Sequence, residues 1–168
     1  MKRKEPFDPA TQVQDSFQKG PFGDVNPAVT DSATFMFEKG ADMTATFHGQ
    51  KQDAFLYSRH WNPMNMTLCK ALAAMEGTEA AWVTGSGMAA ITNAMLQLVS
   101  AGDHIVASPT VYGGTFAFLK NYLPKFGISV TFADTTKPAQ VEKAMRKNTK
   151  FIYTETMSNP MLRIADIP

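Results

Sequence analysis

Short apolar runs alternate with stretches of helical spacing through the second half of the chain. The apolar runs, each the length of a buried strand, cover 79–83, 104–108, 128–133 and 151–155. Helical spacing lies between them, over 88–99, 114–126 and 138–147. We expect the second of these helices to break near Pro124 and the third to begin at Pro138. Strands separated by helices form βαβ units, so the pattern predicts an α/β fold with a mostly parallel sheet.

A further helix is expected ahead of the first strand. Its apolar residues recur on one helical face, at Leu68, Leu72 and Met75. Asn65 or Thr67 can cap the start, and Gly77 can close the end.

Residues 1–50 differ from the rest of the chain. They carry scattered Pro and Gly without sustained periodicity, which predicts an irregular arm. The arm and its junction hold too many aromatic residues for a free polar linker: Phe17, Phe22, Phe35, Phe37, Phe47 and Phe55. We therefore expect the arm, residues 1–50, to pack against something, such as another subunit, and residues 51–168 to begin the α/β domain.

Composition narrows the function classes. The 168 residues are 44% hydrophobic and 18% charged, which is typical of a globular domain. The net charge of +1 creates no extended field for nucleic acid or a membrane surface. Cys69 has no second cysteine to pair with, and no apolar stretch resembles a signal peptide or a membrane span. We expect a cytoplasmic protein that binds neither nucleic acid nor membrane.

In parallel sheets, ligands bind beyond the carboxyl ends of the strands, so the loops there are the first candidates. The loop 84–88 is rich in glycine and opens onto a helix, where backbone N–H groups of Ser86, Gly87 and Met88 can bind a phosphate. A tight strand-to-helix connection would have the same sequence. Both interpretations stay open on this loop alone.

Three other segments carry candidate chemistry. Tyr112 follows the second strand and can stack on a flat cofactor or transfer a proton, or simply cap the sheet. Glu155 and Asn159 follow the fourth strand and can reach the same crevice, although Asn-Pro is also a common turn. Tyr57 and Arg59 can clamp a phosphate, but a solvated surface loop explains them equally well.

Competing chemistries find less support. Gly85, Gly87 and Ala90 match the glycine fingerprint of nicotinamide dinucleotide binding, yet the acidic residue that should hold the ribose is missing at 108–110. The three histidines and Cys69 lack metal-ligand spacing, so no metal site is expected. Ser86 lacks the first glycine of a nucleophile elbow.

Taken together, four motifs in order resemble one family. They are Tyr57-Ser58-Arg59-x-x-Asn62-Pro63, Ser86-Gly87-Met88-x-Ala90-Ile91, Val111-Tyr112-Gly113-Gly114-Thr115 and Glu155-x-x-x-Asn159-Pro160. This order and spacing is similar to the Cys/Met-metabolism enzymes that use pyridoxal 5′-phosphate (PLP), such as cystathionine γ-synthase, methionine γ-lyase and the O-acetylhomoserine sulfhydrylases. The resemblance runs from about Phe47 to the last residue. It implies the PLP-dependent transferase fold of the aminotransferase-like type I, here truncated.

The resemblance also implies roles for individual residues. Gly87 and Met88, beside Ser86, would bind the cofactor phosphate, and Tyr112 would stack on its ring and move protons. Asn159 would bind the phenolic oxygen, and Glu155 would support the pocket. Tyr57 and Arg59 would reach the phosphate of a neighbouring subunit, so that active sites are shared in a dimer of dimers.

Some positions depart from the family pattern. Met64 replaces a usual Thr, and Gly114 stands where methionine γ-lyases commonly have Cys, which weakens that specific assignment. The aldimine lysine and the aspartate that pairs with the pyridinium nitrogen belong to a later part of the family's sequence. Lys150 is no substitute, because it precedes the fourth strand on the wrong side of the sheet.

The sequence thus predicts the amino-terminal part of a PLP-dependent carbon–sulfur lyase or transferase. Its substrate would be a sulfur-containing or O-acylated amino acid such as methionine, cystathionine or O-acetylhomoserine, and the 168-residue chain alone is expected to be inactive. The alternatives are an NAD(P)-binding oxidoreductase and a non-catalytic oligomerising fragment.

Overall fold

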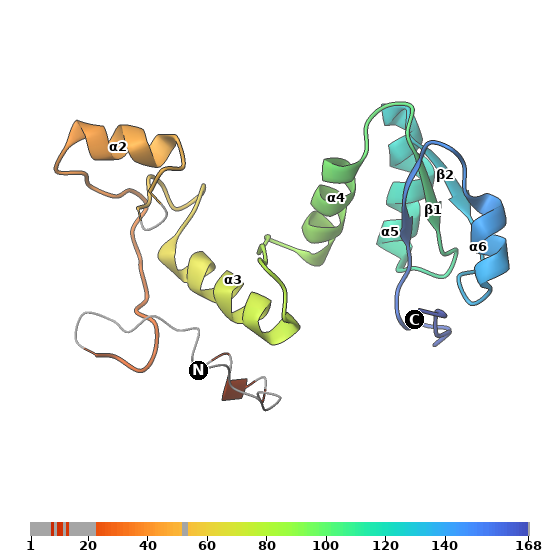
Figure 1. The fold of residues 1–168 in the computed structure, drawn as a ribbon, viewed down its shortest axis with the longest axis horizontal. Coiled ribbons are helices and arrows are strands. Elements are labelled where there is room, and N and C mark those ends of the chain that lie inside the picture. Colours follow the sequence, from red (N-terminus) through yellow and green to blue (C-terminus); the bar gives the residue numbers. More distant parts are fainter. Residues whose placement is uncertain (1–7, 9, 12, 14–22, 52–53, 168) are drawn as a thin grey trace, which may run out of the picture. The chain divides into compact units, whose positions relative to one another are not determined.

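The computed structural model describes residues 8, 10–11, 13, 23–51 and 54–167. Phe17 and Phe22 lie outside the described residues. The chain forms two compact units, Met1–Val83 and Thr84–Pro168, each of which we describe by itself. Helices and strands are labelled as in Figure 1.

The second unit contains a parallel sheet of three strands. They are β1 (His104–Ala107), β2 (Ser129–Phe132) and β3 (Thr149–Tyr153), in the order β2-β1-β3. His104 pairs with Ser129 on one side and with Thr149 on the other, and both pairings are parallel. The predictions of strands at 104–108, 128–133 and 151–155 and of a parallel α/β fold are confirmed.

The helices of this unit are α4 (Gly87–Leu98), α5 (Gly113–Ala117) and α6 (Pro138–Ala144). After α5 the chain continues as one π-helical turn, Phe118–Tyr122, and one 3-10 turn, Leu123–Phe126. Pro124 lies at the start of the 3-10 turn, where its missing N–H is tolerated. The expected break near Pro124 and the expected start at Pro138 are confirmed.

Alternation along the strands determines which helix covers which face of the sheet (Figure 1). Ile105 and Ala107 of β1 are fully buried and pack in one cluster with Met95 of α4 and with Leu119 and Leu123. Ile152 of β3 and Thr154, directly after that strand, instead line a hollow together with residues of α6. Helices therefore cover both faces, as a parallel sheet requires.

The strand predicted over 79–83 does not form. These residues are irregular, and no described residue pairs with them in a ladder. A strand is stabilised by inter-strand hydrogen bonds, so an apolar run without a pairing partner stays extended coil. Thr84–Ser86 still leads directly into α4.

The first unit contains α2 (Gly40–Phe47) and α3 (Pro63–Glu76). The helix predicted from about residue 65 is confirmed as α3, and Gly77 closes it in the left-handed conformation, at φ +63°. Its cap, however, is Asn62 rather than Asn65 or Thr67. The Asn62 side chain accepts the Met64 N–H at 2.8 Å, and Pro63 occupies the first turn.

One further expectation for this unit needs correction. The supposedly irregular arm contains α2, which sequence periodicity did not reveal because the helix buries no residue. The apolar face of α3 is only partly covered, since Leu68 is 50% and Met75 48% exposed. One aromatic contact joins the arm to the following segment: the Phe35 ring lies 5.5 Å from that of Phe55.

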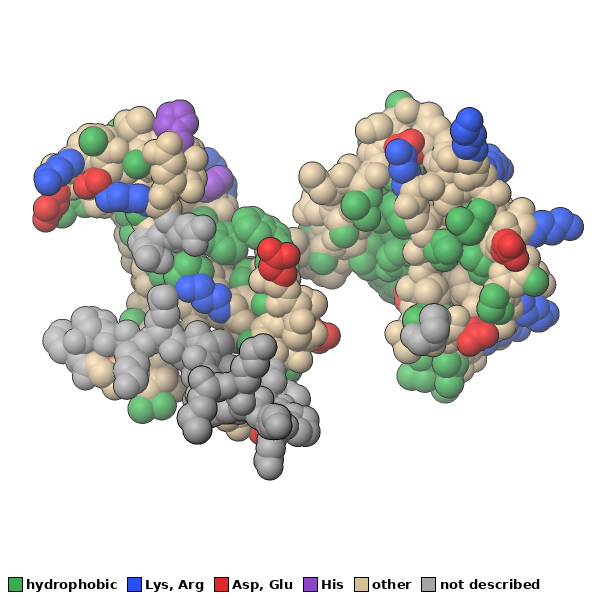
Figure 2. Space-filling model, in the orientation of Figure 1, with side chains coloured by type: hydrophobic (Ala, Val, Ile, Leu, Met, Phe, Trp, Pro, Cys, Tyr) green, Lys and Arg blue, Asp and Glu red, His purple; other side chains and the backbone are tan. Residues whose placement is uncertain are grey.

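The surface of the described residues carries charged side chains of both signs. On the face shown in Figure 2, basic and acidic side chains are scattered over both units. Among the described residues, no helix has the length and hydropathy needed to cross a membrane.

The cap of α3 gives a first prediction. Asn62 is 6% exposed, and besides capping the helix its amide donates to Ser58 Oγ at 2.8 Å. Asn62→Ala should therefore lower the free energy of unfolding by about 1–2 kcal/mol, measured by urea denaturation followed by circular dichroism. The matched control is Asn65→Ala, because Asn65 is exposed in the same helix and caps nothing. Equal losses in the two variants would contradict the assigned cap.

His104 connects the three strands at the amino end of the sheet. Its ring is fully buried, with Nδ1 2.7 Å from Thr149 Oγ1 and Nε2 2.8 Å from Thr131 Oγ1. Arg146 donates from its guanidinium to Thr131 and from its backbone to Thr149. Burial, and secondarily the charge of Arg146, lower the pKa of His104 from its ordinary value of 6.5.

This lowered pKa predicts acid sensitivity. As the pH falls below about 6.5, the unfolded chain binds a proton that the folded unit binds only at lower pH, so the free energy of unfolding decreases. The stability advantage of the wild type over His104→Gln should shrink across this range, measured by urea unfolding at a series of pH values. An advantage that stays constant or grows on acidification would refute the assignment.

Candidate active site

The start of α4 presents two unused backbone donors. Ser86 caps the helix, with its Oγ accepting the Ala89 N–H at 3.1 Å and its carbonyl accepting the Ala90 N–H at 3.0 Å. Within the described part of the chain, the N–H groups of Gly87 and Met88 have no acceptor. Such donors, at the positive end of the helix dipole, bind anions.

The glycines of this turn leave the donors accessible. A Cβ atom built on Gly85 or Gly87 would meet nothing within 4 Å, and Ser86 is exposed. The Thr84 hydroxyl donates to the Ser86 carbonyl at 2.8 Å, which holds the turn. An anion can therefore reach Gly87 and Met88 from solvent.

Tyr112 and Glu155 meet beyond the carboxyl ends of adjacent strands. Tyr112 precedes α5 in the loop after β1, and Glu155 follows β3. The Tyr112 N–H donates to Glu155 Oε1 at 2.8 Å, while the Tyr112 side chain is 53% exposed. The loop is thus fixed by its backbone, and the ring remains available to a ligand.

Met88 links the start of α4 to this loop. Thr115 of α5 is fully buried, and its Oγ1 lies 3.9 Å from the Met88 sulfur. Five of the predicted residues therefore gather in one region of the second unit: Ser86, Gly87, Met88, Tyr112 and Glu155.

Thr115 and Tyr153 belong to the same region, and the sequence did not single out either. Burial raises the pKa of the Tyr153 hydroxyl, hydrogen bonding with Thr115 opposes this shift, and the charge of Glu155 reinforces it. Alternation along β3 is the signal that could have placed Tyr153 at this edge.

Asn159 is in the same unit but, among the described residues, makes no hydrogen bond to the other candidates. It lies in an exposed loop held by an antiparallel bridge between Met157 and Ile164 and by a 2.9 Å bond from Ser158 N–H to the Arg163 carbonyl. Among the described residues, its side chain has no hydrogen-bond partner.

Tyr57 and Arg59 lie in the first unit. The Arg59 guanidinium carbon is 5.0 Å from the centre of the Tyr57 ring, a cation–π contact. Tyr57 pairs with Thr34 in an antiparallel bridge, and Ser58 N–H donates to the Ala33 carbonyl at 2.9 Å. The structure therefore brings these two residues together in an ordered loop of the first unit.

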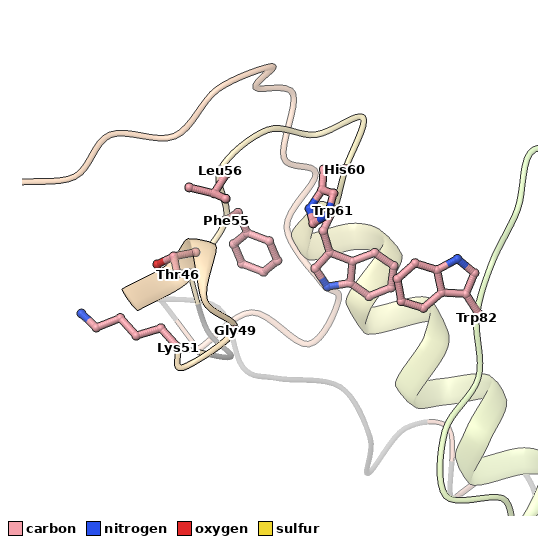
Figure 3. Close-up of a pocket in the computed structure, with 9 residues that line it drawn as sticks. Thr46, Gly49, Lys51, Phe55, Leu56, His60, Trp61 and Trp82 are labelled. Atoms are coloured by element: carbon pink, nitrogen blue, oxygen red, sulfur yellow. The ribbon is translucent and has the colours of Figure 1, made fainter. Parts of the chain in front are cut away.

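A hollow of about 380 Å³ adjoins this loop (Figure 3). Its most distinctive feature is a stacked pair of indole rings, Trp61 and Trp82, with centroids 4.3 Å apart. Figure 3 also labels Lys51, whose ammonium group pairs with Asp42 at 2.5 Å. No sequence signal joined the two tryptophans, because they lie far apart along the chain without any periodic relation.

Comparisons with known proteins match this chain to one family. The family model described as "Cys/Met metabolism PLP-dependent enzyme" matches residues 10–168. The chain belongs to this family of PLP-dependent enzymes. The family assignment from the four motifs is thereby confirmed, and PLP is the family's cofactor.

Individual relatives agree with the family model. The chain is 41% identical to a methionine gamma-lyase of Arabidopsis thaliana over 96% of its own length and 38% of that protein. It is 41% identical to a cystathionine beta-lyase of Bacillus subtilis, over 84% of this chain and 37% of the relative. The chain thus spans well under half of these relatives.

The fold is confirmed by a solved structure. A chain described as an O-acetylhomoserine (thiol)-lyase from Campylobacter jejuni superposes with a TM-score of 0.89 at 31% identity. The match covers 96% of this chain and 40% of the other, which carries a pyridoxyl-lysine monophosphate.

The residues present fit part of the PLP cofactor. The two free amides at the start of α4 suit a phosphate, and the exposed Tyr112 ring suits a planar heterocycle. Family membership also favours PLP over the nicotinamide dinucleotide considered from the glycine spacing.

The bond between Tyr112 and Glu155 gives a prediction for the site. In Glu155→Ala the Tyr112 N–H loses its acceptor, so its hydrogen exchange with solvent should accelerate by about tenfold or more. Glu155→Gln retains an oxygen acceptor and should stay within a few-fold of wild type. Hydrogen exchange is followed by NMR. Wild-type protection of the Tyr112 N–H in the Glu155→Ala variant would contradict the structure.

Proposed function

We propose that this chain is the amino-terminal part of a PLP-dependent enzyme that removes or replaces the γ-substituent of an amino acid. The substrate is a sulfur-containing or O-acylated amino acid, such as methionine, cystathionine or O-acetylhomoserine. The observation that carries this proposal is the pair of unused Gly87 and Met88 amides beside Tyr112, in a chain whose family uses PLP. The names of the relatives, which include lyases and an O-succinylhomoserine sulfhydrylase of Pseudomonas aeruginosa, support this substrate class.

In this proposal each residue has a physical role. Ser86, Gly87 and Met88 bind the phosphate, which fixes the cofactor at the positive end of α4. The Tyr112 ring stacks on the cofactor ring, and its hydroxyl accepts and returns a proton during the reaction. Glu155 holds the Tyr112 backbone at 2.8 Å. When bound, the cofactor supplies an electron sink that stabilises negative charge on the substrate carbons.

Two further roles involve residues outside this cluster. The Asn159 amide donates to the phenolic oxygen of the cofactor. Tyr57 and Arg59 bind the phosphate held by a neighbouring subunit, so the active sites are shared within a cytoplasmic dimer of dimers. An exposed guanidinium without a carboxylate partner among the described residues supports this role for Arg59. Residues 1–50 then form the arm that contacts the neighbour, and 51–168 the first part of the cofactor-binding domain.

We also propose that the 168-residue chain alone does not turn substrate over. Lys150, which follows Thr149 in the sequence, lies at the amino end of β3 with its ammonium group 3.6 Å from Asp103. Tyr112 and Glu155 lie beyond the opposite end of the same strand pair. Lys150 is therefore badly placed to react with a cofactor bound near Tyr112.

The phosphate role is tested by Gly87→Pro. Ser86 is extended (φ −164°, ψ 160°), as a residue before proline must be, and proline is favoured at the first helical position. The substitution thus deletes one N–H donor while preserving the helix. Affinity for pyridoxine 5′-phosphate, measured by calorimetry, should fall about tenfold, which corresponds to one charge-assisted hydrogen bond.

The matched control is Gly87→Ala, which keeps the N–H and has open space for its methyl group. Pyridoxine 5′-phosphate is the probe because, without an aldehyde, it cannot react with surface lysines. Pyridoxine without phosphate should bind much more weakly to the wild type. Equal binding of the two compounds, or an unchanged affinity in Gly87→Pro, would count against the phosphate site.

The proposed inactivity has its own assay. The purified chain, mixed with PLP and methionine, should release no thiol or 2-oxo acid above the level of PLP alone. Release that disappears when one lysine of the chain is substituted would overturn this part of the proposal.

A further inference from the structure

We propose that the Thr115 hydroxyl positions the start of α4, because it joins Met88, whose amide we assign to the phosphate, to Tyr153 on the sheet. The use of the amide rests on the proposed function, whereas the link through Thr115 rests on the coordinates. Thr115 is in this view a positioning residue, which acts on the phosphate through Met88.

Met88 attaches the phosphate turn to the rest of the unit. The hydroxyls of Thr84 and Ser86 form bonds within the turn and with the first turn of α4, and the space around Gly87 is open. Met88 carries the first side chain of α4, and its sulfur lies 3.9 Å from Thr115 Oγ1 of α5. This contact holds the end of α4 that carries the two free donors.

Thr115 uses its hydroxyl differently from other helical threonines of the described chain. A helical threonine can donate to the carbonyl oxygen four residues earlier in its own helix. Four threonines do so: Thr44, Thr46, Thr67 and Thr92. Thr115 is fully buried, and its hydroxyl instead contacts Met88 of α4 and forms a hydrogen bond with Tyr153 of β3. It thereby joins α5 to another helix and to the sheet.

The chemistry of the three side chains determines the direction of these bonds. The Met88 thioether has no proton and can only accept, so Thr115 donates its one hydroxyl proton to the sulfur. The Thr115 oxygen is then an acceptor, and the neutral Tyr153 hydroxyl donates to it. Donors therefore run in one chain from Tyr153 through Thr115 to Met88. Because Thr115 is buried, water cannot replace a lost partner, so the chain opposes displacement of Met88.

Two substitutions of Thr115 separate the hydroxyl from the volume of the side chain. Thr115→Val keeps the branched shape and removes the hydroxyl, whereas Thr115→Ser keeps the hydroxyl and removes the methyl group. The matched control is Thr92→Val. The Thr92 hydroxyl also bonds to Met88, but it donates to the backbone carbonyl, at 2.8 Å, and not to the sulfur.

The first test detects the link without any ligand. In the full chain labelled with ¹³C at the methionine methyl groups, the Met88 signal is assigned by Met88→Leu. Tyr153→Phe removes only a hydroxyl and should shift the Met88 signal in the wild-type and Thr92→Val backgrounds. In a Thr115→Val background the same change should leave the signal in place. An unmoved signal in Tyr153→Phe, or an equal shift in the Thr115→Val background, would overturn the proposal.

The serine variant covers the case in which Thr115→Val does not fold. Serine can donate to Met88 and accept from Tyr153, so Tyr153→Phe should shift the Met88 signal in the Thr115→Ser background as it does in the wild type. A shift that is absent from both backgrounds would show that the hydroxyl does not connect the two residues, and the proposal would be wrong.

The second test measures the consequence for binding by calorimetry. Thr115→Val should weaken pyridoxine 5′-phosphate binding about two- to tenfold, the loss expected from one neutral hydrogen bond. Binding of inorganic phosphate should weaken by the same factor, because the change acts on the phosphate donors and not on the Tyr112 ring. Thr115→Ser and Thr92→Val should bind both compounds as the wild type does.

Two results of the binding test would overturn the proposal. One is wild-type affinity in Thr115→Val. The other is a loss that follows side-chain volume, with Thr115→Ser weakened as much as Thr115→Val or more. Should the wild type bind neither compound, the proposed function fails, while the Met88 signal still decides whether Thr115 links Met88 to Tyr153.

Discussion

Parallel pairing of β1 with β3 is the constraint on which the site depends. Because the two strands run in the same direction, the loops that follow them leave from the same edge of the sheet. This shared edge lets the Glu155 carboxylate accept the Tyr112 N–H at 2.8 Å. The bond joins residues 43 positions apart in the sequence and fixes the backbone position from which the Tyr112 side chain extends.

The second determinant is the contact between α4 and α5. Met88 supplies a backbone donor at the start of one helix, and its sulfur contacts Thr115 in the other. Since Thr115 is fully buried, this contact belongs to the edge of the hydrophobic core and not to a mobile surface. An anion site and an aromatic ring are therefore connected through packed residues. That arrangement suits a ligand that carries a phosphate on a flat heterocycle.

The strands at 104–107, 129–132 and 149–153 were predictable because each is a short apolar run between helical segments. The prediction of a strand at 79–83 was wrong because a strand needs a pairing partner, and a single segment of sequence cannot specify that partner. Pro63 was an available signal for the true start of α3, and α2 gave no signal because it buries nothing. Within the site, the parallel-sheet rule anticipated that Tyr112 and Glu155 would meet. The contact between the Thr115 hydroxyl and the Met88 sulfur depends on side-chain rotamers, which residue spacing does not encode.

Electrostatics explains why the proposed phosphate site needs more than α4. A helix terminus contributes roughly half a positive charge, whereas a phosphate monoester carries between one and two negative charges near neutral pH. In the proposed site, the amides of Gly87 and Met88 would therefore orient the phosphate without neutralising it. Arg59 is suited to supply the remaining charge, because its planar guanidinium stays ionised and can donate two parallel hydrogen bonds. Its guanidinium carbon lies 5.0 Å from the centre of the Tyr57 ring, and because Arg59 is exposed, an anion can reach the guanidinium from solvent.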